Sequence, residues 1–152
     1  MKETPQMKEI VANMQPGVIT LHGFLGTDSR TLQDMLDEDN GTVTRLGLSH
    51  EDLAVKMKYF REEGKRGLGE IISVSPHFEV QVQSVRGILP CPFGHPGTIP
   101  KQNVTVRNKK LDREITFTEL NIHMVEKHGF YEGKGSPFRV SPRDLIEILE
   151  IK

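Results

Sequence analysis

The spacing of the apolar residues changes near residue 70, and this change constrains the fold more than any other feature of the sequence. Before it, apolar side chains recur every three or four residues, as in Leu53, Met57 and Phe60, which is typical of helices that bury one face. After it, Phe78, Val80 and Val82 alternate with polar residues, which is typical of a half-buried strand. Helices that come first and strands that come later predict an α+β fold.

The N-terminal part predicts three helices, each preceded by a side chain that can accept hydrogen bonds from the first turn. The expected helices cover residues 5–14, 29–37 and 50–63. The expected N-caps are Thr4, Asp28 and Ser49. Residues 18–25, between the first two helices, suit a short strand or an extended segment. Gly64 is expected to end the third helix, and the glycines between 64 and 69 mark the best candidate domain boundary.

The second half of the chain predicts a hairpin followed by two helices. Strands are expected around residues 104–106 and 115–117, with a turn at 108–112 between them. A helix is expected over residues 119–128, and a last one after Ser141. The result is an α+β fold with N-terminal helices, a small antiparallel sheet, a ββα unit and a C-terminal helix. It divides into a mainly helical part, 1–70, and an α+β part, 71–152, unless both form one compact domain.

Four potential metal ligands lie in this second half at paired spacings. Cys91, which is the only cysteine, and His95 flank a short turn that contains a glycine, and His123 and His128 lie at the end of the expected helix. The pattern is C-x3-H-x27-H-x4-H. Thiolate and imidazole are the ligands that zinc prefers, and binding would contribute to the folding of this part. We therefore expect zinc bound by these four residues, although five positions separate the two helical histidines by about 140° on a regular helix.

The stretch Leu120-x2-His123-x4-His128-Gly129, preceded by a hairpin and by Cys91-Pro92, resembles the two-cysteine two-histidine zinc finger. The resemblance covers roughly residues 88–130 and implies a zinc-finger-like ββα unit. His95 stands where a second cysteine is usual, and the 27-residue gap exceeds the roughly 12 residues of a DNA-reading finger. The resemblance implies a structural zinc in a protein that contacts another macromolecule, with a cellular role that the sequence does not define.

A catalytic zinc is the alternative that the sequence leaves open. A small hydrolytic enzyme would use Cys91, His123 and His128 as ligands and leave the fourth position to water, with Glu126 as a base. The residues from His123 to His128 match neither the H-E-x-x-H nor the H-x-x-E-H protease pattern. We therefore assign no catalytic residue and expect the closed, structural site.

The net charge of −1 argues against a protein built mainly to bind nucleic acid, but the charge is uneven. Residues 86–113 contain six basic side chains and one acidic side chain. Weak nucleic-acid binding, if present, would use phosphate contacts from this stretch. The basic residues involved would be Lys101, Arg107, Lys109, Lys110 and Arg113. A protein partner is the other expectation.

The sequence predicts a cytoplasmic protein without a membrane segment. No apolar run approaches the roughly 20 residues of a membrane helix. The acidic N-terminal residues do not suit a signal peptide, and a single cysteine cannot form an internal disulfide.

Two glycine-rich stretches stand apart from the metal pattern. Residues 22–26, HGFLG, resemble the oxyanion loop of lipases, but the chain lacks the G-x-S-x-G nucleophile motif of that fold. Residues 129–138 contain glycines, aromatic residues and Lys134, but they lack the phosphate-loop signature. Both are interpreted as turns with aromatic side chains packed inward.

Overall fold

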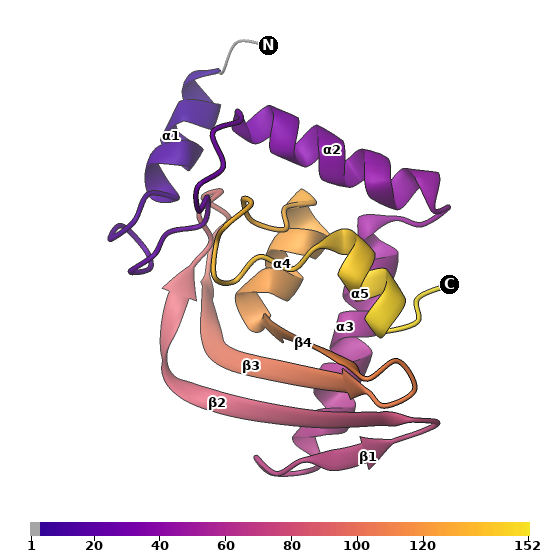
Figure 1. The fold of residues 1–152 in the computed structure, drawn as a ribbon. Coiled ribbons are helices and arrows are strands. Elements are labelled where there is room, and N and C mark those ends of the chain that lie inside the picture. The colour runs from indigo at the N-terminus through magenta and orange to yellow at the C-terminus, as the bar shows by residue number, and fades with distance from the viewer. Residues whose placement is uncertain (1–3) are drawn as a thin grey trace.

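The structure of the chain, a computed structural model, describes residues 4–152. Within that range the elements follow one another as α1 (Pro5–Asn13), α2 (Leu32–Arg45), α3 (His50–Lys65), β1 (Ile72–Val74), β2 (Phe78–Pro90), β3 (Thr98–Asn108), β4 (Arg113–Thr118), α4 (Glu119–His128) and α5 (Pro142–Ile148) (Figure 1). The α+β fold is therefore confirmed. No helix in this range is both long and apolar enough to cross a membrane.

The four strands form one antiparallel sheet in the order β1-β2-β3-β4. β2 and β3 are the longest strands, and they curve together away from the rest of the sheet (Figure 1). Their pairing runs from Phe78–Asn108 at one end to Pro90–Thr98 at the other, with a shift in register between Ser84 and Ile88. Beyond this shift the two strands continue as a two-stranded ribbon, because β4 pairs only with residues 103–108 of β3.

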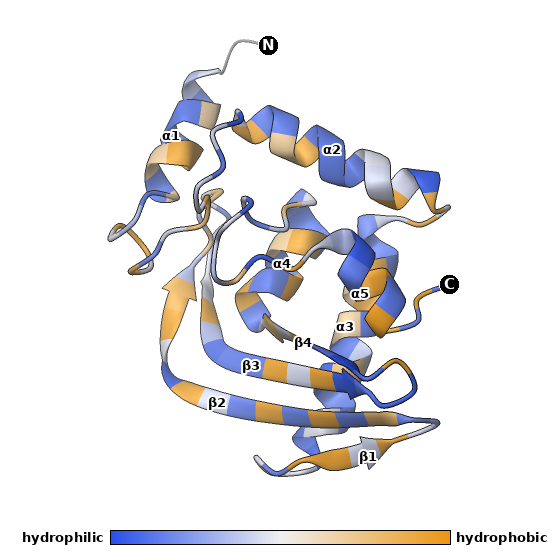
Figure 2. Ribbon diagram, in the orientation of Figure 1, coloured by the Kyte–Doolittle hydropathy of each residue, from blue (hydrophilic) through white to orange (hydrophobic). Residues whose placement is uncertain are grey.

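Two hydrophobic cores lie on the helical side of the sheet. The main core joins α3, α4 and α5 to the inward side chains of the strands, and it includes Phe60 of α3, Val80 of β2 and Phe117 of β4. Figure 2 shows the alternation of apolar and polar residues along β2 and β3 that the sequence predicts. The second core lies where the ribbon meets α1, α2 and α4, and it includes Phe24 and Phe130.

The helix caps confirm most of the expected boundaries. Ser49 and Asp52 form a capping box at the start of α3, and Thr118 and Asn121 form another at the start of α4. Gly129 ends α4 in the left-handed conformation, with φ of 61°. These signals are local, so the sequence is sufficient to identify them.

The boundaries of α2 differ from the prediction. Its N-cap is Thr31 rather than Asp28, and the helix continues to Arg45. Asp28 is engaged elsewhere: its carboxylate accepts hydrogen bonds from the Arg30 side chain and from the backbone N–H of Lys134. The ion pair with Arg30 therefore occupies Asp28, and Thr31 caps the helix instead. Residues 18–25 form turns rather than a strand.

Gly64 lies inside α3 instead of ending it. A Cβ atom at this position would lie 2.6 Å from both Val80 Cγ1 and Val82 Cγ2. The glycine therefore allows the helix to approach β2 closely, and its role is packing rather than termination.

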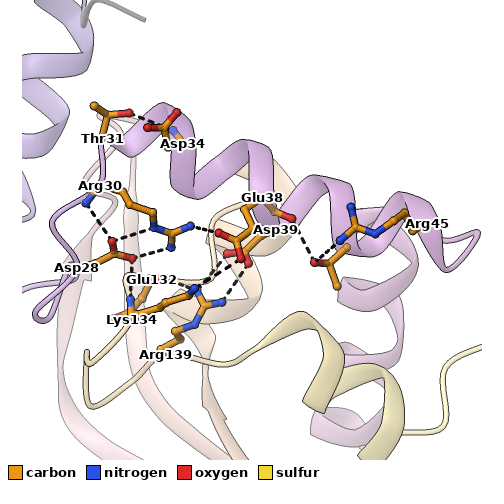
Figure 3. Close-up of polar contacts among 11 residues, drawn as sticks. Asp28, Arg30, Thr31, Asp34, Glu38, Asp39, Arg45, Glu132, Lys134 and Arg139 are labelled. Atoms are coloured by element: carbon orange, nitrogen blue, oxygen red, sulfur yellow. Dashed lines mark hydrogen bonds and ion pairs between the residues drawn. The ribbon is translucent and has the colours of Figure 1, made fainter.

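Ion pairs tie α2 to the two glycine-rich loops (Figure 3). Arg139 pairs with Asp39 of α2 at 3.0 Å, and both side chains are largely buried. The same guanidinium donates a hydrogen bond to the backbone carbonyl of Glu132. Arg30 pairs with Asp28 and with Glu38. The loop before α2 and the loop after α4 are therefore held against the same helix.

The carboxyl group of Glu132 is buried beside these ion pairs. It is 3% exposed, and its side chain accepts hydrogen bonds from Ser136 Oγ at 2.7 Å and from Asn121 Nδ2 at 3.1 Å. Burial raises the pKa of Glu132 to about 7, against the opposing effects of these two hydrogen bonds and of the Arg139 charge. The ionised form is therefore disfavoured in the folded protein.

Substitution of alanine for glycine should have opposite effects on stability at Gly64 in α3 and at Gly41 in α2. Gly64→Ala should lower the free energy of unfolding by about 1–3 kcal/mol, because the new methyl group overlaps two buried valines. Gly41→Ala in α2 should raise it by about 0.5–1 kcal/mol, because only the flexible end of Arg45 lies nearby and alanine favours the helix. Urea unfolding measures both values. Equal effects of the two substitutions would contradict this account of Gly64.

Glu132 predicts a pH dependence of stability. Its pKa is about 7 in the folded protein against 4.5 for a free side chain, so the folded state binds more protons between these values. The contribution of Glu132 to stability is complete below pH 4.5 and is lost as the pH rises through about 7, by on the order of 3 kcal/mol. Glu132→Gln should remove this loss in urea unfolding at a series of pH values. Glu114→Gln, on the exposed side of β4, is the control, and parallel profiles for Glu132→Gln and wild type would contradict the assignment.

Candidate metal centre

The end of the β2–β3 ribbon and the end of α4 meet because their lengths match. Thr118, the last residue of β4, lies opposite Asn103 of β3. From there, α4 extends for 10 residues, about 15 Å, in the direction of the ribbon's tip. β3 covers the five residues back to Thr98 in about 17 Å. The C-terminus of α4 is therefore level with the loop over residues 91–97.

This arrangement brings Cys91, His123 and His128 together. One potential ligand atom from each residue lies within 4.8 Å of the other two. Cys91 Sγ and His128 Nε2 are 3.4 Å apart. Ligand atoms around a tetrahedral metal bonded to sulfur and nitrogen are separated by roughly 3.3–3.6 Å. The cluster could therefore hold a metal ion.

His123 supplies an independent indication that this cluster suits a metal ion. Its Nε2 atom is buried and has no hydrogen-bond partner among residues 4–152. Buried polar side-chain atoms are nearly always paired, because leaving one unpaired costs about 1–3 kcal/mol. A metal ion bound by Nε2 would satisfy this atom, so the residues present fit the group.

The imidazoles have the protonation state that ligation requires. Burial lowers the pKa of His123, and the nearby His95 and Lys127 charges lower it further. Burial, followed by the charges of His123 and His95, lowers the pKa of His128 to about 4. Both rings are therefore neutral near pH 7, with a lone pair available to a metal.

Aromatic packing fixes the loop that contains Cys91. Phe93 stacks on His128, with ring centroids 4.1 Å apart and an angle of 8° between the planes. Phe130 packs edge-on against Phe93. The Asn13 side chain donates a hydrogen bond to the carbonyl of Pro92 at 3.1 Å. Sequence reasoning missed Phe93, because only its position two residues after Cys91 linked it to the site.

The five-residue spacing of the helical histidines does not keep them apart. α4 is regular to His128, yet the ring centroids of His123 and His128 are 5.4 Å apart and the planes are at 70°. Both side chains nevertheless reach Cys91.

His95 lies near the cluster but outside its tight group of three. Its ring centroid is 4.9 Å from that of His123 and 5.8 Å from that of His128, and the residue is exposed. Gly94 and Gly97, with φ of 81° and 101°, flank it on the loop. The role of His95 as the fourth ligand therefore stays a prediction.

Glu126 and His50 lie on the other side of His128, around a hollow of about 360 Å³. Glu126 forms an ion pair with Lys58, and this hydrogen bond holds the pKa of Glu126 below its usual value. His50 Nδ1 lies 2.7 Å from the Tyr131 hydroxyl, and His50 Nε2 lies 3.0 Å from Asn40 Oδ1. Both ring nitrogens of His50 are therefore occupied by protein partners.

The unpaired His123 nitrogen predicts that a substitution of His123 changes stability differently with and without metal. In the presence of a chelator, His123→Phe should be as stable as wild type or more stable by about 1–3 kcal/mol, because no polar atom is left buried. When zinc is added, only the wild type should gain stability. Thermal unfolding measures both, with the exposed His22→Phe as control. A variant that gains as much as wild type from zinc would remove His123 from the ligand set.

Comparison of the chain with protein-family models, with curated proteins and with solved structures finds no match. The structure brings Cys91, His123 and His128 within metal-ligand distance, and the resemblance to a zinc finger stays a prediction.

Proposed function

We propose that this protein binds one zinc ion and that the zinc is structural, joining the tip of the β2–β3 ribbon to the C-terminus of α4. The observation that supports this proposal best is the convergence of Cys91, His123 and His128, with His123 Nε2 buried and unpaired. The two elements otherwise meet through aromatic stacking and the second core. A metal bond at this point would close the segment from β3 to α4 into a ring.

The donor set favours zinc over the other common metals. One thiolate and two or three imidazoles are soft to borderline ligands, which suit zinc and exclude magnesium and calcium. A thiolate ligand remains reduced in the cytoplasm, where the sequence predicts this protein to be.

Two features favour a structural zinc over a catalytic one. His95 lies on the exposed loop beside His123, where a change of rotamer would bring in a fourth protein ligand. Glu126, the nearest candidate for a general base, is held ionised by Lys58 and has a lowered pKa, which makes it a weak base. A closed tetrahedral site is typical of structural zinc.

The hollow beside His128 supports the alternative, a small zinc-dependent hydrolytic enzyme. A water molecule in place of His95 would complete a site of Cys91, His123 and His128, and a substrate would enter from this side. The number of protein ligands separates the two functions.

A protein is the favoured macromolecular partner. Arg107 pairs with Asp112, and Arg113 pairs with Asp144, so two of the five basic residues are already neutralised. Lys101 lies on the ribbon, six residues along β3 from Arg107, and is about 20 Å from it. The positive charge is therefore spread out, and any nucleic-acid binding is expected to be weak and sensitive to salt.

Metal analysis and X-ray absorption test the proposal together. The full-length protein, purified without a chelator, should contain about one zinc per chain, with one sulfur and three imidazole nitrogens as ligands. Cys91→Ser should weaken zinc binding and increase hydrogen exchange in β3, β4 and α4 more than in α3, because a hydroxyl does not replace the thiolate.

His95→Ala separates the structural site from the catalytic one. It should lower the zinc affinity about tenfold or more if His95 is a ligand, while His22→Ala, on the exposed N-terminal loop, should leave it unchanged. A wild-type site with two imidazoles and a water would favour the enzyme, and protein free of transition metals would contradict both readings.

A further inference from the structure

A cavity of about 350 Å³ lies away from the metal ligands. Its walls come from the β2–β3 ribbon, the start of α4, the loop over residues 19–24 and the loop that follows α4 (Figure 1). None of Cys91, His95, His123 and His128 lines it. The volume is within the range of small-molecule binding sites.

The two glycine-rich loops form one side of this cavity because they pack backbone against backbone. The N–H of Gly133 donates a hydrogen bond to the carbonyl of Phe24 at 2.8 Å. A Cβ atom at Gly133 would lie 2.2 Å from the Leu25 carbonyl oxygen, and one at Gly26 would lie 2.2 Å from the backbone nitrogen of Ser136. Only glycine permits this approach, and the approach fixes the position of Glu132, which precedes Gly133.

Glu132 lines the cavity in an unusual state. Its φ of 71° lies in the left-handed region, which a glutamate rarely adopts. Its carboxylate accepts two hydrogen bonds from neutral groups, Asn121 and Ser136, but it has no ion-pair partner among residues 4–152. Arg139, the nearest cation, bonds the backbone carbonyl of Glu132 and pairs with Asp39 (Figure 3). The buried carboxyl therefore lacks a countercharge, and such positions are frequent at functional sites.

The remaining lining is mainly apolar and continues to the surface. Leu21, Val85 and Phe138 line the cavity and are 79%, 51% and 47% exposed. Exposed apolar side chains grouped around one opening are typical of a binding site. Lys101 is the other charged residue in the lining, and its aliphatic stem lies over Gly87 of the ribbon.

We propose that this cavity binds a small organic monocation, a primary amine on an apolar body, whose ammonium group pairs with Glu132. The apolar body contacts the hydrophobic walls, and the ammonium group supplies the positive charge that the Glu132 carboxyl group otherwise lacks. Lys101 disfavours a second positive charge on the ligand. A bound cation would stabilise the ionised carboxylate and so lower the pKa of Glu132 from its raised value of about 7.

Amide chemical shifts of the full-length, isotope-labelled protein test the proposal with phenethylamine as the probe. Phenethyl alcohol and hydrocinnamate, which have similar apolar bodies, are the matched neutral and anionic probes. Phenethylamine should produce saturable shifts at cavity residues such as Gly23, Leu120 and Glu132. It should bind about tenfold or more tightly than the alcohol, since a charge-assisted bond replaces a neutral one.

Two variants assign the effect to the cavity. Glu132→Gln should remove most of the preference for the amine. Val85→Trp should block all the probes, whereas Val55→Trp, which lies on the exposed side of α3 away from the cavity, should block none. Val85→Trp keeps the test decisive if Glu132→Gln does not fold. An amine that produces no saturable shifts at the cavity, or that binds no better than the alcohol, overturns the proposal, as does full amine binding by a folded Glu132→Gln protein.

Discussion

The pairing of β2 with β3 is the constraint on which the rest of the structure depends. Near its base, Val80 and Val106 lie opposite each other and face the main core. Near its tip, Leu89 and Ile99 lie opposite each other and pack against the second core. One hairpin therefore joins the two cores. Its tip is far from the main core, so the loop over residues 91–97 needs an anchor of its own.

α4 provides that anchor, and its length determines where the ligands meet. The chain leaves the sheet at Thr118, beside the middle of β3, and returns along the helix to the tip of the ribbon. His128 ends this path beside Cys91. The 27 residues between His95 and His123, which are too many for a compact DNA-reading finger, are thus occupied by β3, a turn, β4 and the first turn of α4. A buried, unpaired His123 would be a net cost without a metal ion, and ligation would offset it.

Local signals made much of the fold predictable, and long-range contacts limited the rest. The Ser49 cap of α3 was identified because its hydrogen bonds lie within one turn. The predicted start of α2 was wrong because Asp28 and Thr31 are both good N-caps. The ion pair between Asp28 and Arg30, which lies outside the helix, decides between them. Gly64 was misinterpreted because a glycine that ends a helix and one that admits a neighbouring strand look alike in sequence. The Cys91, His123 and His128 cluster was expected from spacing, but its stacking on Phe93 was not.

Asn121 shows how the candidate metal centre and the cavity share one helix. Its side-chain oxygen accepts the Thr118 N–H in the capping box of α4, and its amide nitrogen donates to Glu132 in the cavity wall. Leu120, its neighbour, lines the cavity, while His123 and His128 lie further along the same helix. The ribbon is shared in the same way, since Leu89 lines the cavity two residues before Cys91. A metal ion that joins the ribbon to α4 would therefore also tie together two of the cavity's walls, because Leu89 and Leu120, which line the cavity, lie on the same two segments as Cys91 and His123.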